Sequence, residues 1–397
     1  MTGPRPDGAL ARARALVPEL RARAAKDDEQ ASFPTASLDL LRADGLMGLL
    51  VPREHGGAGG TLADLSAVAR VLAGGCLSTA LIWAMHCQQV VTIADHATPA
   101  LGRRLLPRIA AGEVYVASVT SERGKGGHLT SAVAPLVRRG GTVLLERDAP
   151  IVTGGEHADG FLVTMRDGDQ AAEHAVTLVY ADRVQVRAVS TDGGWNPMGM
   201  RATHSSALRL SGEVPADQIV GPAGRFRDVA AALFAPAAHI AWASCWLGAA
   251  TAVTRDVLAL LRTPSGRREF DARSDLLLDR IARIRLDLDA VHALLTRVIR
   301  DVDAARGAGA DAVPGGGGAA AHLRINGLKI FAAETLMGTA DRLMDLTGLR
   351  HGYMRDAAVP VERLFRDLKA ARLNYSNDRL TAANGLLAHL DPEVCLD

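Results

Sequence analysis

Lysine is scarce in this chain: it occupies four of the 397 positions, although lysine and arginine together number 45. Arginine therefore supplies nearly all of the positive charge, and 44 acidic residues balance it to a formal net charge of +1. A balanced charge creates no strong field that would attract a polyanion. We therefore expect neither a nucleic-acid partner nor an anionic membrane surface as a partner.

Cysteines and long apolar runs are also few. The four cysteines form no CxxC pair and have no metal-ligand spacing, so we expect reduced, mostly buried thiols and no metal site. No apolar run reaches the roughly 18 residues that span a bilayer. Residues 1–20 have neither the continuous apolar core nor the cleavage site of a signal peptide. These absences predict a cytoplasmic protein without a membrane-spanning segment.

Hydrophobic periodicity divides the chain into three regions, which fits the two or three domains expected at this length. The first region, residues 8–112, has mostly helical patterns. We expect Gly45 to end one helix in a left-handed cap, and Pro107 to stop the last one. The predicted helices cover residues 37–44, 61–73, 79–97 and 100–106.

The middle region consists of short runs, many rich in β-branched residues, that are separated by Gly, Asp and Arg. Such runs predict the strands of an antiparallel sheet or barrel. Helical periodicity returns near Phe226, and residues 276–300 are strongly amphipathic. We expect residues 307–321, which are glycine-rich, to form a flexible loop, because they have no lysine and no preceding strand to make a phosphate loop. The predicted strands cover residues 114–120, 132–137, 142–147, 160–165, 174–180 and 207–210.

Several short motifs follow one another in a fixed order. Residues 121–128 read SERGKGGH, residues 151–155 read IVTGG, and residues 352–355 and 360–367 read GYMR and PVERLFRD. Glycines in the first motif let backbone N–H groups approach a ring edge or a diphosphate closely. In this order the motifs resemble those of the acyl-CoA dehydrogenase superfamily of flavoproteins, and the resemblance covers nearly the whole chain.

The resemblance implies a fold and a cofactor. The fold is an α+β arrangement with an N-terminal helical domain (residues 1–115), a central antiparallel β domain (residues 116–222) and a C-terminal helical bundle (residues 223–397). The cofactor is FAD, held in the cleft between the domains. The last domain also builds the oligomer in that superfamily, so the resemblance implies a homodimer or homotetramer.

The resemblance also implies which residues contact the flavin. Thr153 matches a threonine that faces the flavin ring, and Ile151 stands where an aromatic residue usually packs. Arg267, in an R-x-x-F motif, matches an arginine that reaches the cofactor of a neighbouring subunit, where a guanidinium suits a diphosphate. The implied cofactor-binding residues are Thr120, Ser121, Gly124, Gly126, Gly127, Thr153 and Arg267. The motif of residues 121–128 departs from the superfamily pattern at Arg123, Gly127 and His128.

Two further segments have a structural interpretation. Residues 198–201, MGMR, resemble the strand that closes the β domain in the superfamily. The charged side chains of the PVERLFRD motif are expected to form an ion-pair network, whose members are Glu362, Arg363, Arg366 and Asp367.

The catalytic glutamate of many superfamily dehydrogenases has no counterpart in this sequence. That residue removes the α-proton of a thioester, a weak acid that needs a base within hydrogen-bond reach. The matching position holds Tyr375, or Asn374 if the alignment shifts by one residue, and residues 235–242, the alternative location, have no carboxylate. Neutral Asn is no base and Tyr is a poor one. His239 or His128 is a possible substitute, because imidazole titrates near neutrality.

Two enzymatic interpretations remain, and the absent glutamate favours the first. It is a monooxygenase that takes reduced flavin from a partner reductase and uses molecular oxygen, which needs a dry pocket but no α-proton base. The second is a dehydrogenase with an unusual base among Tyr375, Asn374, His128 and His239. The substrate is a free small molecule or an acyl thioester of CoA or a carrier protein. A non-catalytic flavin-binding protein is a third alternative.

Overall fold

The computed structural model describes residues 6–124, 128–191, 194–307, 318–391, 393, 394 and 396, and it begins with helices. The predicted helices of this region are confirmed. Gly45, which follows the helix Thr35–Ala43 and its C-cap Asp44, has a φ of +64°. The expectation that Pro107 stops the fifth helix is wrong. That helix continues to Ala110, because Leu105, Leu106 and Ile109 are buried along one face across the lost hydrogen bond. The helices are α1 (Pro6–Gln30), α2 (Thr35–Ala43), η1 (Arg53–His55), α3 (Leu62–Ala73), α4 (Leu77–His96) and α5 (Pro99–Ala110).

The middle of the chain forms two four-stranded sheets, with strand orders β1-β4-β5-β8 and β2-β3-β7-β6. The pairs are antiparallel except β1 with β4, which run parallel, so the predicted all-antiparallel arrangement is corrected at that pair. The strands are β1 (Val116–Val119), β2 (Val137–Arg139), β3 (Thr142–Ala149), β4 (Gly160–Arg166), β5 (Val176–Asp182), β6 (Val186–Ser190), β7 (Leu208–Pro215) and β8 (Ile219–Val220). Short 3-10 turns between them are η2 (Gly155–His157), η3 (Arg183–Gln185), η4 (Arg201–Thr203) and η5 (Ala216–Gln218).

The prediction differs from the sheets at several places, among them β8, which it did not include, and β7, which is longer than predicted. Residues 132–136 form an isolated bridge at Pro135 but no strand, because the backbone N–H groups of Val133 and Ala134 donate to the carboxylate of Glu122. The sixth strand was missed because only Val186 of its five residues is buried, which leaves no alternation of apolar and polar residues to detect.

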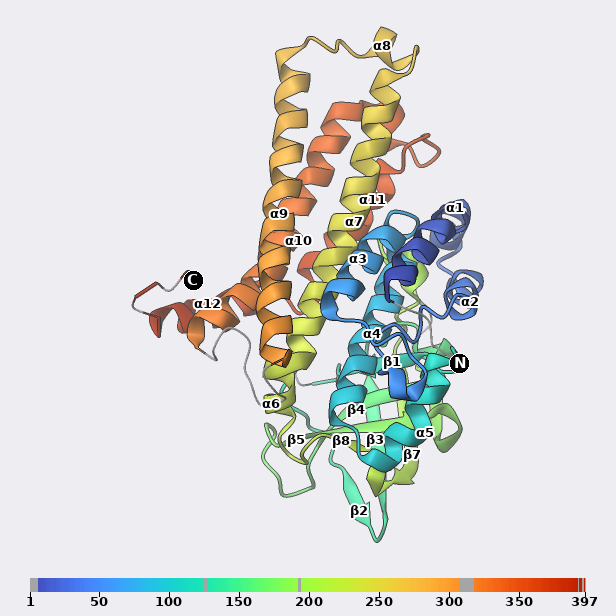
Figure 1. Cartoon of the computed structure of the whole chain (residues 1–397), viewed down its shortest axis with the longest axis vertical. Coiled ribbons are helices and arrows are strands. Elements are labelled where there is room, and N and C mark those ends of the chain that lie inside the picture. The colour runs from blue at the N-terminus through green and yellow to red at the C-terminus, as the bar shows by residue number, and fades with distance from the viewer. Residues whose placement is uncertain are drawn as a thin grey trace.

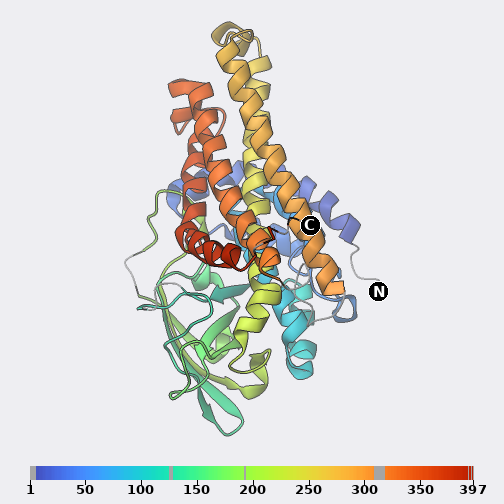
Figure 2. The same ribbon diagram turned by 90° about the vertical axis from the view of Figure 1, so that its left-hand side faces the viewer.

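The C-terminal part is a helical bundle whose long helices stand above the sheets (Figures 1 and 2). The hairpin of α7 and α9 is closed at its far end by α8, and α12 projects to one side (Figure 1). The elements are α6 (Phe226–Val229), η6 (Ala230–Phe234), α7 (Ala235–Arg262), α8 (Gly266–Glu269), α9 (Asp275–Gly307), α10 (Ala319–Gly348), η8 (Leu349–Tyr353), α11 (Val361–Lys369), η9 (Ala370–Arg372) and α12 (Asn377–His389).

One helical run is more apolar than the sequence interpretation allowed. Phe226–Arg262 is long and apolar enough to cross a membrane by length and composition alone, but 83% of its most apolar window is buried inside the molecule. Such burial is typical of a core helix, and α7 indeed packs against α3, α4, α9 and α10. The thiols of Cys76, Cys87 and Cys245 are free and buried, as expected. The domain boundaries at residues 115 and 222 stay predictions.

Candidate active site

A cavity of about 450 Å³ opens where the three parts of the chain meet. Helix α4 lines one side, loops of the sheets line a second, and the start of α7 with α11 and the turn after it lines the third. Five predicted site residues are brought together here: Thr120, Ser121, Thr153, Asn374 and Tyr375. Sequence reasoning missed most of the other lining residues, among them Leu81, Met85, Gln88, Trp195, Trp242 and Lys369.

The remaining predicted residues do not line this cavity. Gly124 lies in the loop that begins at Ser121 and has a φ of +83°. His128 is exposed. Gly126 and Gly127 lie outside the described residues. Arg267 is on α8, at the end of the bundle farthest from the sheets (Figure 1). Its contact with the cofactor of a neighbouring subunit stays a prediction.

His239 lies behind the cavity wall. Its ring centroid is 6.0 Å from that of Trp242 and 6.2 Å from that of Tyr375, and its Nδ1 is 3.2 Å from the carbonyl oxygen of Ile325. Burial lowers the pKa of His239 to about 4, with a further contribution from the charge of Lys329. The imidazole is therefore neutral at physiological pH and is a much weaker base than an ordinary histidine.

Tyr375 enters the cavity from a turn in which its own φ is +49°, a left-handed conformation that is unusual for a residue with a side chain. Its ring lies 5.1 Å from that of Trp242. Burial raises the pKa of the Tyr375 hydroxyl, and its hydrogen bond with Thr120 lowers that pKa only in part. The hydroxyl keeps its proton at neutral pH, so Tyr375 can donate a hydrogen bond but is poorly suited to remove a proton.

A chain of hydroxyls forms part of the wall contributed by the sheets. The Thr153 hydroxyl lies 3.0 Å from that of Ser205, which lies 2.9 Å from that of Thr203. The carbonyl of Thr153 accepts a hydrogen bond of 2.8 Å from the Tyr115 hydroxyl. Ser121 donates to the carbonyl of Ile151 at 2.7 Å, so the two predicted flavin motifs are tied to each other. The predicted hydroxyl residues thus have fixed positions.

A buried ion pair supports the loop that begins at Ser121. The guanidinium of Arg147, on β3, lies 2.8 Å from the carboxylate of Glu122, and the two side chains are 0% and 6% exposed. Glu122 also accepts from the N–H groups of Val133 and Ala134, while Arg147 donates to the carbonyl of Ser121 at 3.0 Å. Burial lowers the pKa of Arg147 to about 10, which still leaves it charged at neutral pH. This pair fixes the path of the loop across the sheet edge.

Residues 198–201 form a turn that leads into η4 rather than the predicted strand. A Cβ added to Gly199 would lie 2.0 Å from the carbonyl oxygen of Arg366, so only glycine allows this backbone to touch α11. The N–H of Met200 donates to Asp367 at 2.5 Å. Burial raises the pKa of Asp367 to about 7. The segment therefore joins the sheets to α11 and forms part of the cavity wall.

The lining has an unusual charge pattern. Among the described residues that line the cavity, none has a carboxylate or an imidazole. Arg366 lies 2.6 Å from Asp28 and 2.7 Å from Glu362, so its charge is compensated and the expected ion-pair network is present at this residue. Lys369 is exposed at the cavity and has no ion pair within the described part of the chain.

The residues of this cavity fit a flavin. Leu81, Met85 and Ile151 supply apolar surface for a flat ring, and Ile151 is 55% exposed in this structure. The indole N–H of Trp242 is buried, and no acceptor for it exists among the described residues. An unpaired buried donor costs free energy, and a ring with carbonyl and imine acceptors offers it partners. Thr120, Ser121 and Thr153 would hold the ring from the opposite wall.

Residues 10–113 match the family model described as "Acyl-CoA dehydrogenase, N-terminal domain", and residues 233–374 match "Acyl-CoA dehydrogenase, C-terminal domain". The chain is 27% identical over 372 residues to cyclohex-1-ene-1-carbonyl-CoA dehydrogenase of Syntrophus aciditrophicus, covering 92% of this chain and 84% of that protein. It is also 27% identical over 376 residues to L-evernosamine nitrososynthase of a Micromonospora strain, covering 89% and 83%. FMN-bound TdsC from Paenibacillus sp. A11-2 has the same fold, with a TM-score of 0.83 at 19% identity over 95% of this chain and 96% of that one.

We expect the double replacement Ser121→Ala with Thr153→Ala to weaken FAD binding about thirtyfold, because each change removes one hydrogen bond worth about 1 kcal/mol from the loop or the ring contact. Fluorescence titration of the apoprotein with FAD measures the affinity. Ser190→Ala, at an exposed position of β6, is the matched control and should leave it unchanged. An unaltered FAD affinity in the double variant would show that these hydroxyls do not contribute to flavin binding.

Proposed function

This chain belongs to the acyl-CoA dehydrogenase family of FAD-dependent oxidoreductases, and from that premise we propose that it is a monooxygenase. The proposed enzyme uses reduced flavin and molecular oxygen to oxidise a small molecule or a thioester-bound group. One observation carries the proposal: no carboxylate or imidazole is found among the described residues that line the cavity. Abstraction of an α-proton has no suitable acceptor there, whereas oxygenation needs none.

The side chains near the expected base position support this choice. Tyr375 holds its proton at neutral pH, and the amide of Asn374 is not basic. His239 lies outside the cavity and is a weak base for the reasons given above. His128 is exposed and also lies outside the lining.

The cavity has features that favour oxygen chemistry. When bound, reduced flavin supplies the electrons that activate dioxygen. Trp195, Trp242 and Met85 provide apolar surface that excludes water, which protects a reactive oxidant from hydrolysis. Tyr375 supplies a hydroxyl donor that orients a polar substrate group without removing its protons. The 27% identity to a nitrososynthase over 89% of the chain also favours oxidation of a substrate heteroatom.

The charge of Lys369 at the cavity indicates which kind of substrate group we propose. Lys369 is exposed and has no ion pair in the described part of the chain, so it suits an anionic group on the substrate, such as a phosphate.

A separate flavin reductase would provide reduced flavin. We also propose a homodimer or homotetramer that works in the cytoplasm, with Arg267 reaching the cofactor of a neighbouring subunit.

A dehydrogenase is the second candidate. The 27% identity to an acyl-CoA dehydrogenase over 92% of the chain favours it. In that case Tyr375, or a histidine that moves on substrate binding, is the base. A third possibility, a flavin-binding protein without activity, would hold FAD and turn over no substrate.

We expect no acyl-CoA in a panel of straight, branched and cyclic thioesters to bleach the oxidised flavin in the absence of oxygen. Stopped-flow absorbance of the FAD-loaded protein measures this directly. Tyr375→Glu is a second variant to measure in the same way. It places a carboxylate in the cavity lining, so thioesters that bind should bleach its flavin slowly. Rapid bleaching of the unaltered protein, abolished by Tyr375→Phe, would instead support the dehydrogenase with a tyrosine base.

A further inference from the structure

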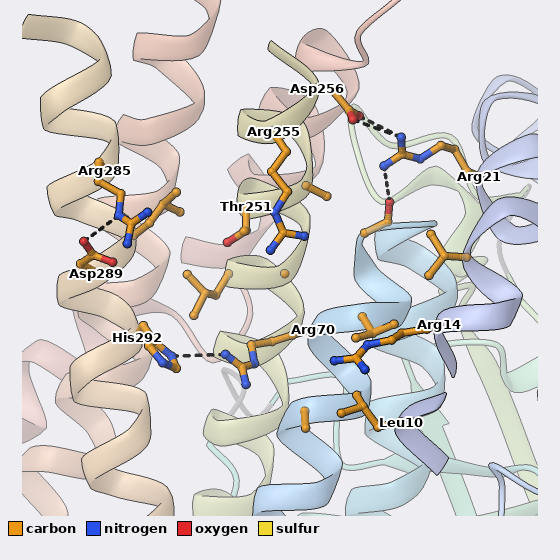
Figure 3. A pocket seen from close by; sticks show the side chains of 18 residues that line it. Leu10, Arg14, Arg21, Arg70, Thr251, Arg255, Asp256, Arg285, Asp289 and His292 are labelled. Atoms are coloured by element: carbon orange, nitrogen blue, oxygen red, sulfur yellow. Dashed lines mark hydrogen bonds and ion pairs between the residues drawn. The ribbon is translucent and has the colours of Figure 1, made fainter. Parts of the chain in front are cut away.

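A second cavity, of about 680 Å³, lies between α1, α3, α7 and α9 (Figure 3). None of its lining residues lines the candidate active site. Its inner boundary is fixed by close packing, because a Cβ added to Gly248 on α7 would lie 2.3 Å from the carbonyl oxygen of Arg70 on α3. Its volume falls in the range of about 300–1,000 Å³ that is typical of small-molecule sites.

Positive charge is in excess in this cavity. Among the described residues, five arginines and two acidic side chains line it. Each acid already has its own arginine: Asp256 lies 3.1 Å from Arg21, and Asp289 lies 2.7 Å from Arg285. Three guanidiniums are therefore left without a carboxylate among the described residues. They come from three helices, and Figure 3 shows that of Arg70 extending to His292 on α9. They belong to Arg14, Arg70 and Arg255.

Arg70 is the most informative of the three. Its Nη1 lies 3.3 Å from Nδ1 of His292, but its Nε is buried and has no acceptor among the described residues. Burial lowers the pKa of Arg70, and no nearby carboxylate raises it again. A partly buried cation without an anion is unfavourable, because its lost hydration is not replaced. A bound anion would supply the missing acceptor.

His292 adds another donor to the same cavity. Burial lowers its pKa, and the charge of Arg70 lowers it further, so the ring is neutral at physiological pH. Since Nδ1 faces the guanidinium of Arg70 and accepts from it, the remaining proton is on Nε2. Apolar side chains, among them Val71, Leu247 and Leu288, form the rest of the walls. The cavity therefore combines a group of donors with apolar surface.

We propose that this cavity is a second ligand site, which binds a small molecule carrying a diphosphate through Arg14, Arg70 and Arg255. Guanidinium forks donate parallel hydrogen bonds to phosphate oxygens, and three of them match the several oxygens of a diphosphate better than a single carboxylate. The apolar walls accommodate the organic part of such a molecule, as in a nucleoside diphosphate.

The test uses the FAD-loaded protein, so that the diphosphate of the flavin already occupies its own site. Isothermal titration with inorganic diphosphate and with ADP, at about 0.15 M ionic strength where exposed charges are screened, should show saturable binding of one molecule per chain. Arg70→Gln should weaken it about tenfold, and Arg70→Gln with Arg255→Gln about a hundredfold. Arg283→Gln, at an exposed arginine of α9 paired with Asp279 outside the cavity, should have no effect.

Three results would overturn the proposal. The first is no saturable binding of either probe to the unaltered protein. The second is a loss in Arg283→Gln as large as in Arg70→Gln, which would indicate attraction by overall charge only. The third is a lower mass of the double variant than of the unaltered protein in sedimentation, which would mean that another copy of the chain covers the groove. Thermal melts of each variant confirm that it is folded.

Discussion

Replacing Arg147 with methionine is expected to lower the free energy of unfolding by about 3–5 kcal/mol, because it leaves a buried carboxylate without its counter-ion. The side chains of Arg147 and Glu122 are 0% and 6% exposed, so water cannot replace the lost partner. The change also removes the hydrogen bond that Arg147 donates to the carbonyl of Ser121. We therefore expect the loop that begins at Ser121 to lose its fixed path and FAD affinity to fall together with stability.

Urea unfolding followed by circular dichroism measures the loss. Arg209→Met is the matched control, because Arg209 lies in the same sheet and contacts Asp148 at 3.8 Å with 67% of its side chain exposed. Exposed pairs of this kind contribute less than about 1 kcal/mol. A stability change in Arg147→Met no larger than in this control would mean that the buried pair does not support the loop.

Replacing Gly199 with alanine should have the second largest effect. The new methyl carbon would lie 2.0 Å from a backbone oxygen of α11, and the backbone cannot move aside as a flexible side chain can. Overpacking of this kind costs about 1–3 kcal/mol, and more where the backbone is involved. The turn must move away from α11, so the hydrogen bond from Met200 to Asp367 is lost and the cavity changes shape.

Thermal unfolding and FAD fluorescence titration together report the fold and the site. Gly327→Ala, on α10, is the control, since nothing lies within 4 Å of its added Cβ. An alanine there should be neutral or should stabilise by up to about 1 kcal/mol. If Gly199→Ala melts like this control and binds FAD normally, the close contact between the turn and α11 is not required.

The order of elements could be predicted from the sequence, because buried helices and strands leave clear periodicity. The ion pair of Arg147 with Glu122, which supports the loop that begins at Ser121, was not predicted, although the sequence contains a signal for it. Arg147 takes the place of a buried apolar residue in a strand whose alternate positions, Val143 and Leu145, point inwards. A charge at such a position implies a buried partner. Periodicity alone identifies the strand, but it does not indicate which residue is the partner of that charge.

Most of the cavity could not be predicted. Trp242, Lys369 and Leu81 line it together although they are far apart in the chain and have no common motif. The ion pair between Arg366 and Asp28 joins residues 338 positions apart. Only tertiary packing brings such residues together, so local patterns carry no trace of them. The motif residues Thr153 and Ser121 were found because their neighbours resemble a family pattern.

We propose that this family member transfers oxygen rather than removing an α-proton. The most direct measurement is mass spectrometry of products formed under ¹⁸O₂ with NADH, a flavin reductase and FAD. The substrates are a panel of amino sugar nucleotides, aromatic heterocycles and acyl thioesters. We expect a product with one ¹⁸O atom and no product when oxygen is absent. An α,β-unsaturated thioester without ¹⁸O, formed equally well with a chemical electron acceptor in place of oxygen, would contradict it.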